Sequence, residues 1–475
     1  MSMNVIAYDN LRISTFDLEY LKELKITNEI NNHATLELIG ILPSDKGEED
    51  LYSTEEETPI DVYYIDNGEK KSIFNGVISK VKVTVTKEVY YLYVKAYSNT
   101  YLMDITKRSG SFQNIKMSSH ELINKVMSRY SKSDVIINIP NKPIGELVVQ
   151  YNETDWEFLK RFVSRYNAGI LPEIHVPNTK CYIGAEKNSK EEKVDVQSYT
   201  VYKQLDVFNL MKKNYLSDAV ESDYVIYEIQ TPNILKLGSR VNFKNSVFYV
   251  GACNEELING VLCNTYKAQK LNGLRQKQLF NMEIVGASLD GQVIDVKRDK
   301  LKIKLDIDEN QSKESAYWFP YSTMSASPDG SGWYCMPEIN DTVRVYLPTK
   351  NEKEAFAISS VSNYDGAGGS DRMEDPSNKY IRTKDDKEMR FTPQGIEINS
   401  NSGQAVVKLN EDGSISIIGR NTVNITAQET INIRAEKTLT VTAKESVALS
   451  CDKGGSITLA ESGDILLKGT EVKNN

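Results

Sequence analysis

The chain has 475 residues, of which 40% are hydrophobic and 26% are charged, and its formal net charge is −9. This composition indicates a folded protein of about two to four domains and excludes a disordered chain. The negative net charge argues against a general nucleic-acid binder, which needs a basic surface for the phosphates.

The N-terminal residues, MSMNVIAYDNLRIS, contain neither a basic n-region nor an apolar h-region. We therefore expect no signal peptide. No stretch approaches the roughly 20 apolar residues of a transmembrane helix. We expect the chain to be made and assembled in the cytoplasm and, if it leaves, to do so without a signal.

Residues 1–280 are rich in β-branched and aromatic side chains and predict a β-barrel hub. Strict alternation over 77–85 predicts a strand, and 90–94 predicts its partner. An α+β insertion is expected around 110–200. Its two helices are predicted from S/T-x-x-E capping boxes, which begin at Ser118 and Thr154.

A faint internal repeat lies within this hub region. Phe74-Asn75-Gly76 precedes Val94-Lys95-Ala96 by about the distance that separates Phe248-Tyr249-Val250-Gly251 from Tyr266-Lys267-Ala268. We interpret this as two similar barrels. Chance similarity between β-hairpins is the alternative.

The next region, 281–361, predicts a small barrel of the OB type. Apolar residues alternate with polar ones over 301–307 and 343–347, and a Pro-Asp-Gly turn at 328–330 separates the two halves. Residues 362–385 begin with a stretch rich in Gly, Ser and Asp and are expected to form a linker.

Residues 386–475 carry pairs of aliphatic side chains that recur mostly every eight residues, with a two-residue slip near Gly454. Because residues i and i+2 of a strand point the same way, each pair predicts a short strand with two inward side chains. Such repeats are typical of a solenoid. The pairs are Val407/Leu409, Ile415/Ile417, Val423/Ile425, Ile431/Ile433, Leu439/Val441, Val447/Leu449, Ile457/Leu459 and Ile465/Leu467.

Two inward side chains per eight residues are too few for one strand to enclose a core. One chain could supply all three sides of a triangular prism, or three chains could each supply one side. We favour three chains, because interwinding removes the unpaired strand edges of a single-chain needle. The sixteen aliphatic residues are therefore predicted to form the core of a trimeric needle.

Three stretches together resemble the hub-and-spike proteins of contractile injection machines, which include phage tail hubs fused to a cell-puncturing needle, VgrG spikes of type VI secretion and spikes of R-type bacteriocins. Residues 149–161, VQYNETDWEFLKR, are similar to the family's hub segment. Residues 332–337, GWYCMP, followed by the strand 343–345, resemble its barrel pattern. The eight-residue repeats within 386–475, here called octads, resemble its needle. The fold class expected is mainly β: a β-barrel hub with two helices, an OB-fold barrel and a C-terminal triple-stranded β-helix.

The resemblance implies a trimeric central hub and spike that joins a sixfold tube to a threefold needle, which punctures the target envelope. It implies a homotrimer, tube-initiator or tail tube proteins bound at the hub, baseplate wedge proteins, and a separate protein capping the needle tip. The particle could be a virion, a bacteriocin or a secretion machine. Two family variations are not expected: the segment 362–385 is too short for a lysozyme domain, and the tip has no His-x-His iron site, since the histidines are His33, His120 and His175.

No catalytic residue, cofactor or metal site is predicted. The five cysteines have no short C-x-x-C spacing, so neither a disulfide framework nor a zinc site is expected. Glu153 and Asp155 are expected to complement the start of a helix. The acidic run 45–57 is expected to be a solvated loop, and a docking role against a tube protein stays open. No nucleic-acid binding is expected.

Two other functions are considered. A β-solenoid tailspike enzyme that cleaves surface polysaccharide would need paired acids in a broad groove, which layers as thin as these octads do not offer. A fibrous receptor-binding adhesin would need a distal head, and none is predicted after the needle.

Overall fold

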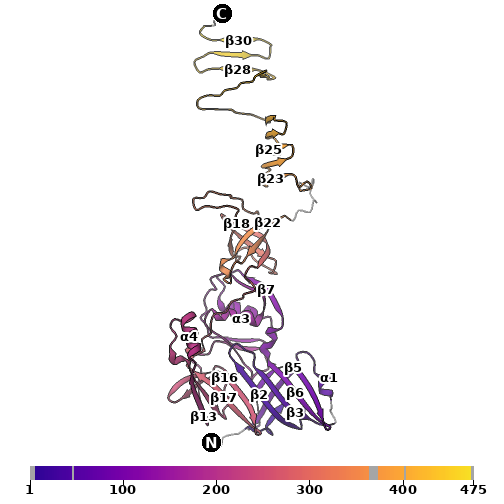
Figure 1. Cartoon of the computed structure of the whole chain (residues 1–475), viewed down its shortest axis with the longest axis vertical. Helices are drawn as coiled ribbons and strands as arrows, with labels where there is room; N and C mark the ends of the chain where they lie inside the picture. Colours follow the sequence, from indigo (N-terminus) through magenta and orange to yellow (C-terminus); the bar gives the residue numbers. More distant parts are fainter. Residues whose placement is uncertain (1–5, 45–47, 363–372, 401–402, 472–475) are drawn as a thin grey trace. The chain divides into compact units, whose positions relative to one another are not determined.

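The computed structural model describes residues 6–44, 48–362, 373–400 and 403–471. Within these ranges the chain is mainly β, as expected, with thirty strands and four α-helices. It divides into two units, Met1–Asn363 and Tyr364–Asn475, which Figure 1 colours from indigo to yellow along the sequence. None of the described helices has the length and apolar character needed to cross a membrane.

Twelve strands of the first unit form one sheet. They are β1 (Leu11–Ile13), β2 (Tyr20–Glu29), β3 (Thr35–Leu42), β4 (Pro59–Asp66), β5 (Glu69–Thr86), β6 (Val89–Ser98), β12 (Glu191–Lys193), β13 (Ser198–Lys203), β14 (Val225–Thr231), β15 (Arg240–Phe243), β16 (Ser246–Ile258) and β17 (Val261–Gln269). The hydrogen-bonded order is β1-β4-β5-β6-β3-β2-β16-β17-β14-β13, and β15 pairs with β12 and β16. Strands from both ends of the hub sequence therefore lie side by side, as Figure 1 shows for β2 and β16.

Strict alternation produces the two hydrophobic cores of this sheet. Every second residue of β3 is buried, as is every second residue of β6 from Leu92 onward. The predicted strands 77–85 and 90–94 lie in β5 and β6, which pair antiparallel. One core contains Leu36 and Val94, and a second core in the other half of the sheet contains Tyr266.

Both predicted helices are present, and each begins with its capping box. They are α2 (Ser119–Met127), capped by Ser118, and α3 (Asp155–Ser164), capped by Thr154. Together with β7 (Lys107–Phe112), β8 (Asp134–Ile137), β9 (Val148–Thr154), β10 (Ile170–Pro172) and β11 (Lys180–Ile183) they enclose a third core.

The sequence analysis missed two further helices. These are α1 (Glu49–Ser53), within the acidic run, and α4 (Leu205–Asn214). Neither has a side-chain hydrogen bond at its N-cap, so neither carries the capping motif by which α2 and α3 were predicted. Short 3₁₀ helices lie at η1 (Asn99–Asp104), η2 (Glu221–Tyr224), η3 (Leu271–Leu274) and η4 (Glu352–Glu354).

Residues 288–361 contain a separate five-stranded sheet with order β20-β19-β18-β21-β22. A bridge between Tyr321 and Ala357 connects its two edges. The Gly332-Trp333 motif lies in the connection between β20 and β21, where Trp333 is exposed. The strands are β18 (Ser288–Lys297), β19 (Lys300–Leu305), β20 (Trp318–Pro320), β21 (Thr342–Tyr346) and β22 (Phe356–Val361).

The second unit consists of two antiparallel meanders. The strand β23 lies inside 362–385, the range expected to be a linker, and residues 363–372 of that range are outside the described part. The first meander comprises β23 (Lys379–Arg382), β24 (Glu388–Thr392), β25 (Gly395–Ser400), β26 (Ala405–Asn410) and β27 (Ile415–Gly419). The second comprises β28 (Val447–Ser450), β29 (Ser456–Leu459) and β30 (Ile465–Lys468).

Candidate functional site

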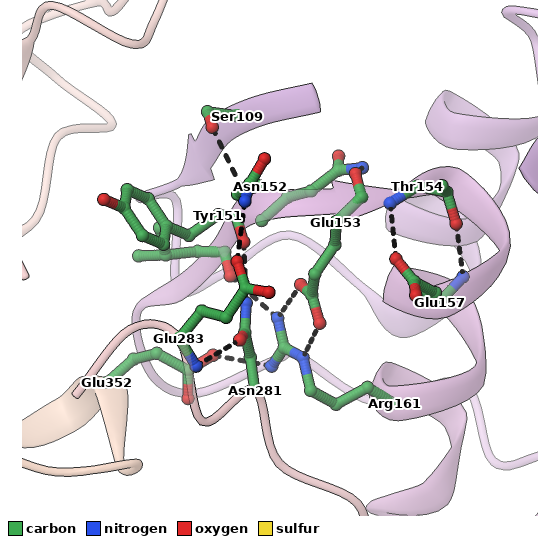
Figure 2. Close-up of polar contacts among 12 residues, drawn as sticks. Ser109, Tyr151, Asn152, Glu153, Thr154, Glu157, Arg161, Asn281, Glu283 and Glu352 are labelled. Carbon is green, nitrogen blue, oxygen red and sulfur yellow. Dashed lines mark hydrogen bonds and ion pairs between the residues drawn. The ribbon is translucent and has the colours of Figure 1, made fainter. Parts of the chain in front are cut away.

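The hub motif 149–161 spans the junction of β9 and α3, shown in Figure 2. The Thr154 hydroxyl accepts a hydrogen bond from Glu157 N at 3.1 Å, and the Glu157 carboxylate accepts one from Thr154 N at 3.0 Å. This reciprocal cap satisfies two backbone donors that a helix start leaves without partners. The motif therefore fixes where the strand ends and the helix begins.

Arg161, at the end of the motif, is the centre of a buried ionic cluster. Its Nε and Nη2 donate to the two carboxylate oxygens of Glu153, both at 2.8 Å, and its Nη1 donates to Glu352 at 2.8 Å. Figure 2 shows the guanidinium pointing toward both carboxylates. Burial opposes the charge on Arg161, but the hydrogen bonds and charges of Glu153 and Glu352 outweigh it and raise the pKa of Arg161.

The two carboxylates expected to complement the helix start have further partners that the sequence did not reveal. Glu153 is bound by Arg161, as described above. Asp155 is fully buried, accepts hydrogen bonds from Tyr130 at 2.7 Å and Gln150 at 2.9 Å, and pairs with Arg129 and Arg108. The capping itself is done by Thr154 and Glu157.

The same segment connects the hub to the five-stranded barrel. Asn152 Nδ2 donates to Glu283 at 2.6 Å, and Asn281 Nδ2 donates to the Tyr151 carbonyl at 2.7 Å, as Figure 2 shows. Val149 packs in the core of the barrel. Glu352 was not predicted, and it lies 191 residues from Arg161 in the chain, too far for any local pattern. The cluster is a structural joint between the two parts.

His33 and His175, which have no suggestive neighbours in the sequence, also have structural partners. His33 Nε2 lies 3.1 Å from Asp104, and His175 Nδ1 lies 2.7 Å from Glu173. Burial opposes the charge on Glu173, but His175 and Lys236 outweigh it and lower the pKa of Glu173. No group of three or more His, Cys, Asp or Glu side chains within the described ranges could hold a metal ion.

Ten of the predicted needle-core residues lie in strands, where they form continuous columns. Val407 faces Ile417 across the β26–β27 pair, and Leu409 faces Ile415. In the second meander, Leu449, Ile457 and Leu467 face one another in turn, as do Val447, Leu459 and Ile465. Nearly all of these side chains are exposed in the single chain.

The other six, at 423, 425, 431, 433, 439 and 441, lie in a segment without strand partners in the single chain. The difference lies in the turns. Gly413, Gly454 and Gly463 adopt positive φ between 81° and 95°, and each turn repeats one bonding pattern, such as Asn410 N to Ser414 O at 2.9 Å and Gly413 N to Asn410 O at 3.1 Å. Residues 420–446 contain no glycine and no residue with positive φ, and no hairpin forms there in the single chain.

Comparison with known proteins identifies the class of fold. The family described as phage tail baseplate hub (GPD) matches residues 56–171. The Escherichia coli c3393 protein, a type VI secretion component described as similar to the T4 tail proteins gp27 and gp5, gives a TM-score of 0.54 at 12% identity over 74% of this chain and 99% of that chain. A chain of the lidded Francisella PdpA–VgrG complex gives 0.55 at 9% identity over 86% and 79%. No match to a curated protein is found.

These likenesses confirm the resemblance read from the sequence, that to VgrG-like hub and spike proteins. The family match covers the hub motif, and the shared fold extends over most of the chain. Together they support a hub of a contractile tail-like injection system.

Proposed function

We propose that three copies of this chain form the central hub and spike of such a particle, with a structural rather than catalytic role. The hub would join a sixfold tube to the threefold needle that punctures the target envelope. The family match and the shared fold support the hub. The proposed trimer and needle are supported by the exposed aliphatic pairs of the octads.

The observation that carries the proposal is the exposure of the octad aliphatics. Ile425 and Ile433 are each 69% exposed, and Val441 is 66% exposed. Burying one such side chain fully contributes about 1.5–3 kcal/mol. A soluble monomer rarely leaves a contiguous apolar surface of this length uncovered, and identical octads of two further copies supply a matching apolar face.

Three is the smallest number of such faces that closes a prism around one interior. Cyclic symmetry then makes every interface identical. The two similar barrels predicted from the internal repeat, six in three copies, would offer six comparable positions to a sixfold tube. We propose tube-initiator or tail tube proteins and baseplate wedge proteins as partners of the hub, and a separate protein as the cap of the needle tip.

Light scattering of the intact chain tests the trimer. We expect a mass of three chains for the parent protein, and dissociation for Ile433→Lys, because the new charge would face the needle interior. Asn432→Lys is the matched control, since adjacent residues of a strand point to opposite faces, and it should remain trimeric. A stable single-chain mass for the parent protein would contradict the proposal.

A further inference from the structure

A row of buried polar side chains crosses the twelve-stranded sheet where its two cores meet. Asn28 of β2, Glu255 of β16 and Asn264 of β17 are 2%, 1% and 1% exposed. On β16, Glu255 lies between Cys253, which belongs to one core, and Leu257, which belongs to the other. Since residues i and i+2 of a strand share a face, the polar row faces the same interior as these apolar side chains.

The pairing of the strands brings the three polar side chains close together. Glu255 lies directly opposite Asn264. Asn28 lies opposite Cys253, which is two residues from Glu255 on the same face. Cβ atoms of opposite residues are about 4.5–5.5 Å apart and those of diagonal residues about 7–8 Å. Side chains as long as Asn and Glu span such distances, so one small ligand would be within reach of all three.

Hydrogen bonds to two covering segments fix the orientation of both amides. Asn28 Nδ2 donates to the Pro172 carbonyl at 3.3 Å. Asn264 Nδ2 donates to the carbonyls of Pro232 and Asn233, both at 3.3 Å. Because the nitrogen of each amide faces a carbonyl oxygen, the amide oxygen is the atom that remains for another partner.

One oxygen of each side chain in the row has no hydrogen-bond partner among the described residues. These atoms are Asn28 Oδ1, Asn264 Oδ1 and Glu255 Oε2. The other carboxylate oxygen of Glu255 lies 3.4 Å from the Tyr266 hydroxyl. Three buried acceptors on one face therefore lack a donor or a positive charge, which is costly unless a ligand supplies it.

We propose that these three oxygens bind a monovalent cation, sodium or potassium. Carbonyl and carboxylate oxygens are the ligands with which proteins replace the hydration shell of such ions. The single carboxylate of Glu255 balances one positive charge, so the occupied site is neutral, whereas a divalent ion would leave an excess charge in the core. The amides of Asn28 and Asn264 add oxygen ligands without adding charge.

The bound ion would join strands from both ends of the hub sequence. β2 belongs to the N-terminal strands of the sheet, and β16 and β17 follow more than two hundred residues later. The ion would contact a side chain from each of these three strands. The inference concerns a single chain, so it goes beyond the proposed function and does not depend on the proposed trimer.

Two titratable side chains of the sheet itself face Glu255. Burial raises the pKa of the Tyr266 hydroxyl and that of the Cys253 thiol well above their ordinary values. Both groups therefore stay neutral near pH 7, and neither offers Glu255 a positive charge.

The third titratable group, His175, faces Glu255 from the segment after β10. Its Nδ1 bonds to Glu173 at 2.7 Å, and Lys236 bonds to the same carboxylate at 2.9 Å. The charge of Glu173 is thereby balanced. His175 Nε2 has no partner among the described residues, so a second proton on this ring is the rival source of positive charge for Glu255.

The ion and a proton compete for the carboxylate of Glu255. Burial raises the pKa of this carboxyl to about 7, so without the ion it takes up a proton near neutral pH. An ion that binds the carboxylate displaces that proton. We therefore expect tighter ion binding at pH 8 than at pH 6.

Urea unfolding of the full-length protein tests the site. At pH 8, sodium or potassium chloride replaces choline chloride at constant ionic strength, because choline is too large for a buried site. The unfolding equilibrium constant should fall by about tenfold for each tenfold rise in the concentration of the binding ion above its Kd. The salt with the larger effect identifies the ion.

Glu255→Gln should lose this ion dependence. Glu256→Gln is the matched control and should keep it, since the adjacent residue of β16 points to the opposite face. Equal stability of the parent protein in all three salts would overturn the site and leave a proton or buried water as the partner of the row. An ion dependence that survives in Glu255→Gln would overturn it as well.

Proton release provides a second measurement that needs no variant. In weakly buffered solution at pH 7, adding the binding ion to the folded parent protein should release about half a proton per chain, because a group at its pKa is half protonated. An indicator dye follows the release, and choline chloride should cause none. The same reading with the binding ion as with choline would contradict the proposal.

Discussion

Arg161 shows how one side chain can join two parts of a chain that are distant in sequence. It contacts Glu153 from the hub and Glu352 from the barrel, and Arg165 also reaches Glu352 at 3.1 Å. The guanidinium groups of Arg161 and Arg165 therefore form one largely buried cluster with the two carboxylates. Such a cluster stabilises only while every charge has its partner, because a buried charge without one is strongly destabilising.

Arg161→Met is predicted to lower the free energy of unfolding by about 3–5 kcal/mol, because it leaves Glu153 and Glu352 buried without their shared partner. Chemical denaturation followed by tryptophan fluorescence measures the change. Arg344→Met is the matched control: Arg344 pairs with Asp290 at 2.9 Å, and both side chains are about half exposed. Its loss should cost less than about 1 kcal/mol. Equal losses in the two variants would show that the cluster does not stabilise the joint.

Glu255, at the junction of β2 and β16, predicts a pH dependence. Burial raises the pKa of its carboxyl to about 7, although His175 and the Tyr266 hydroxyl lower it in part. The unfolded chain has its ordinary value near 4.3. Between about pH 4.3 and 7 the folded state therefore binds more protons than the unfolded state, so this group makes stability fall as pH rises through that window.

Glu255→Gln removes this titration. We expect the variant to gain stability relative to the parent protein between pH 5 and pH 8, by an amount on the order of 3 kcal/mol. Urea denaturation midpoints at the two pH values provide the measurement. An unchanged difference between parent and variant across the window would show that Glu255 titrates normally.

At the scale of elements, the octads fall into two kinds that differ in their turns. Octads separated by a glycine turn fold back within the chain as β26–β27 and β28–β30. The octads of 423–446 have alanine at 427, 435 and 443 and no glycine. Without a glycine between the pairs, a tight hairpin is disfavoured, and in the proposed trimer the other copies would supply the pairing of these strands.

Gly413→Ala is predicted to weaken the β26–β27 hairpin by about 1–2 kcal/mol, because Gly413 has φ +81° and a Cβ is disfavoured there. Hydrogen exchange of the full-length protein should show faster exchange over 405–419, while 456–468 remains unchanged. Glu411→Ala, in the same turn but without positive φ, is the control and should leave exchange as it is. Unaltered protection in Gly413→Ala would mean that glycine is not needed at this turn.

At the scale of the whole molecule, the two units differ in how much hydrophobic core each buries within one chain. The first unit buries four large hydrophobic cores within one chain. In the second, Val406 is the only aliphatic residue buried among those described. With so little internal core, this unit would gain its stability from association in the proposed trimer, and its folding would then be coupled to assembly.

The trimer is therefore predicted to be kinetically stable. Strands hydrogen-bonded between chains cannot separate one at a time, so unfolding should be slow. In SDS without boiling we expect the protein to migrate as a trimer, and after boiling as a chain of 53.6 kDa. Ile433→Lys should migrate as a single chain without boiling. A parent protein that is monomeric in unboiled SDS would argue against the interwound needle.

The amino-acid sequence by itself determined the features that depend on neighbouring residues. Alternation predicted β5 and β6, capping boxes predicted α2 and α3, and the eight-residue spacing revealed the octads. The physical reason is that strand period and helix capping act over a few residues, so they are written directly in the sequence.

Only the tertiary structure decided which distant residues meet. It brought Glu352 to Arg161 and placed β2 on the edge of β16. Among the described residues it left the outer edge of β13, and that of β5 beyond residue 79, without a strand partner. These contacts join segments up to about 230 residues apart, and they are selected by packing and by the pairing of edges over the whole hub. No local pattern in the chain carries that information.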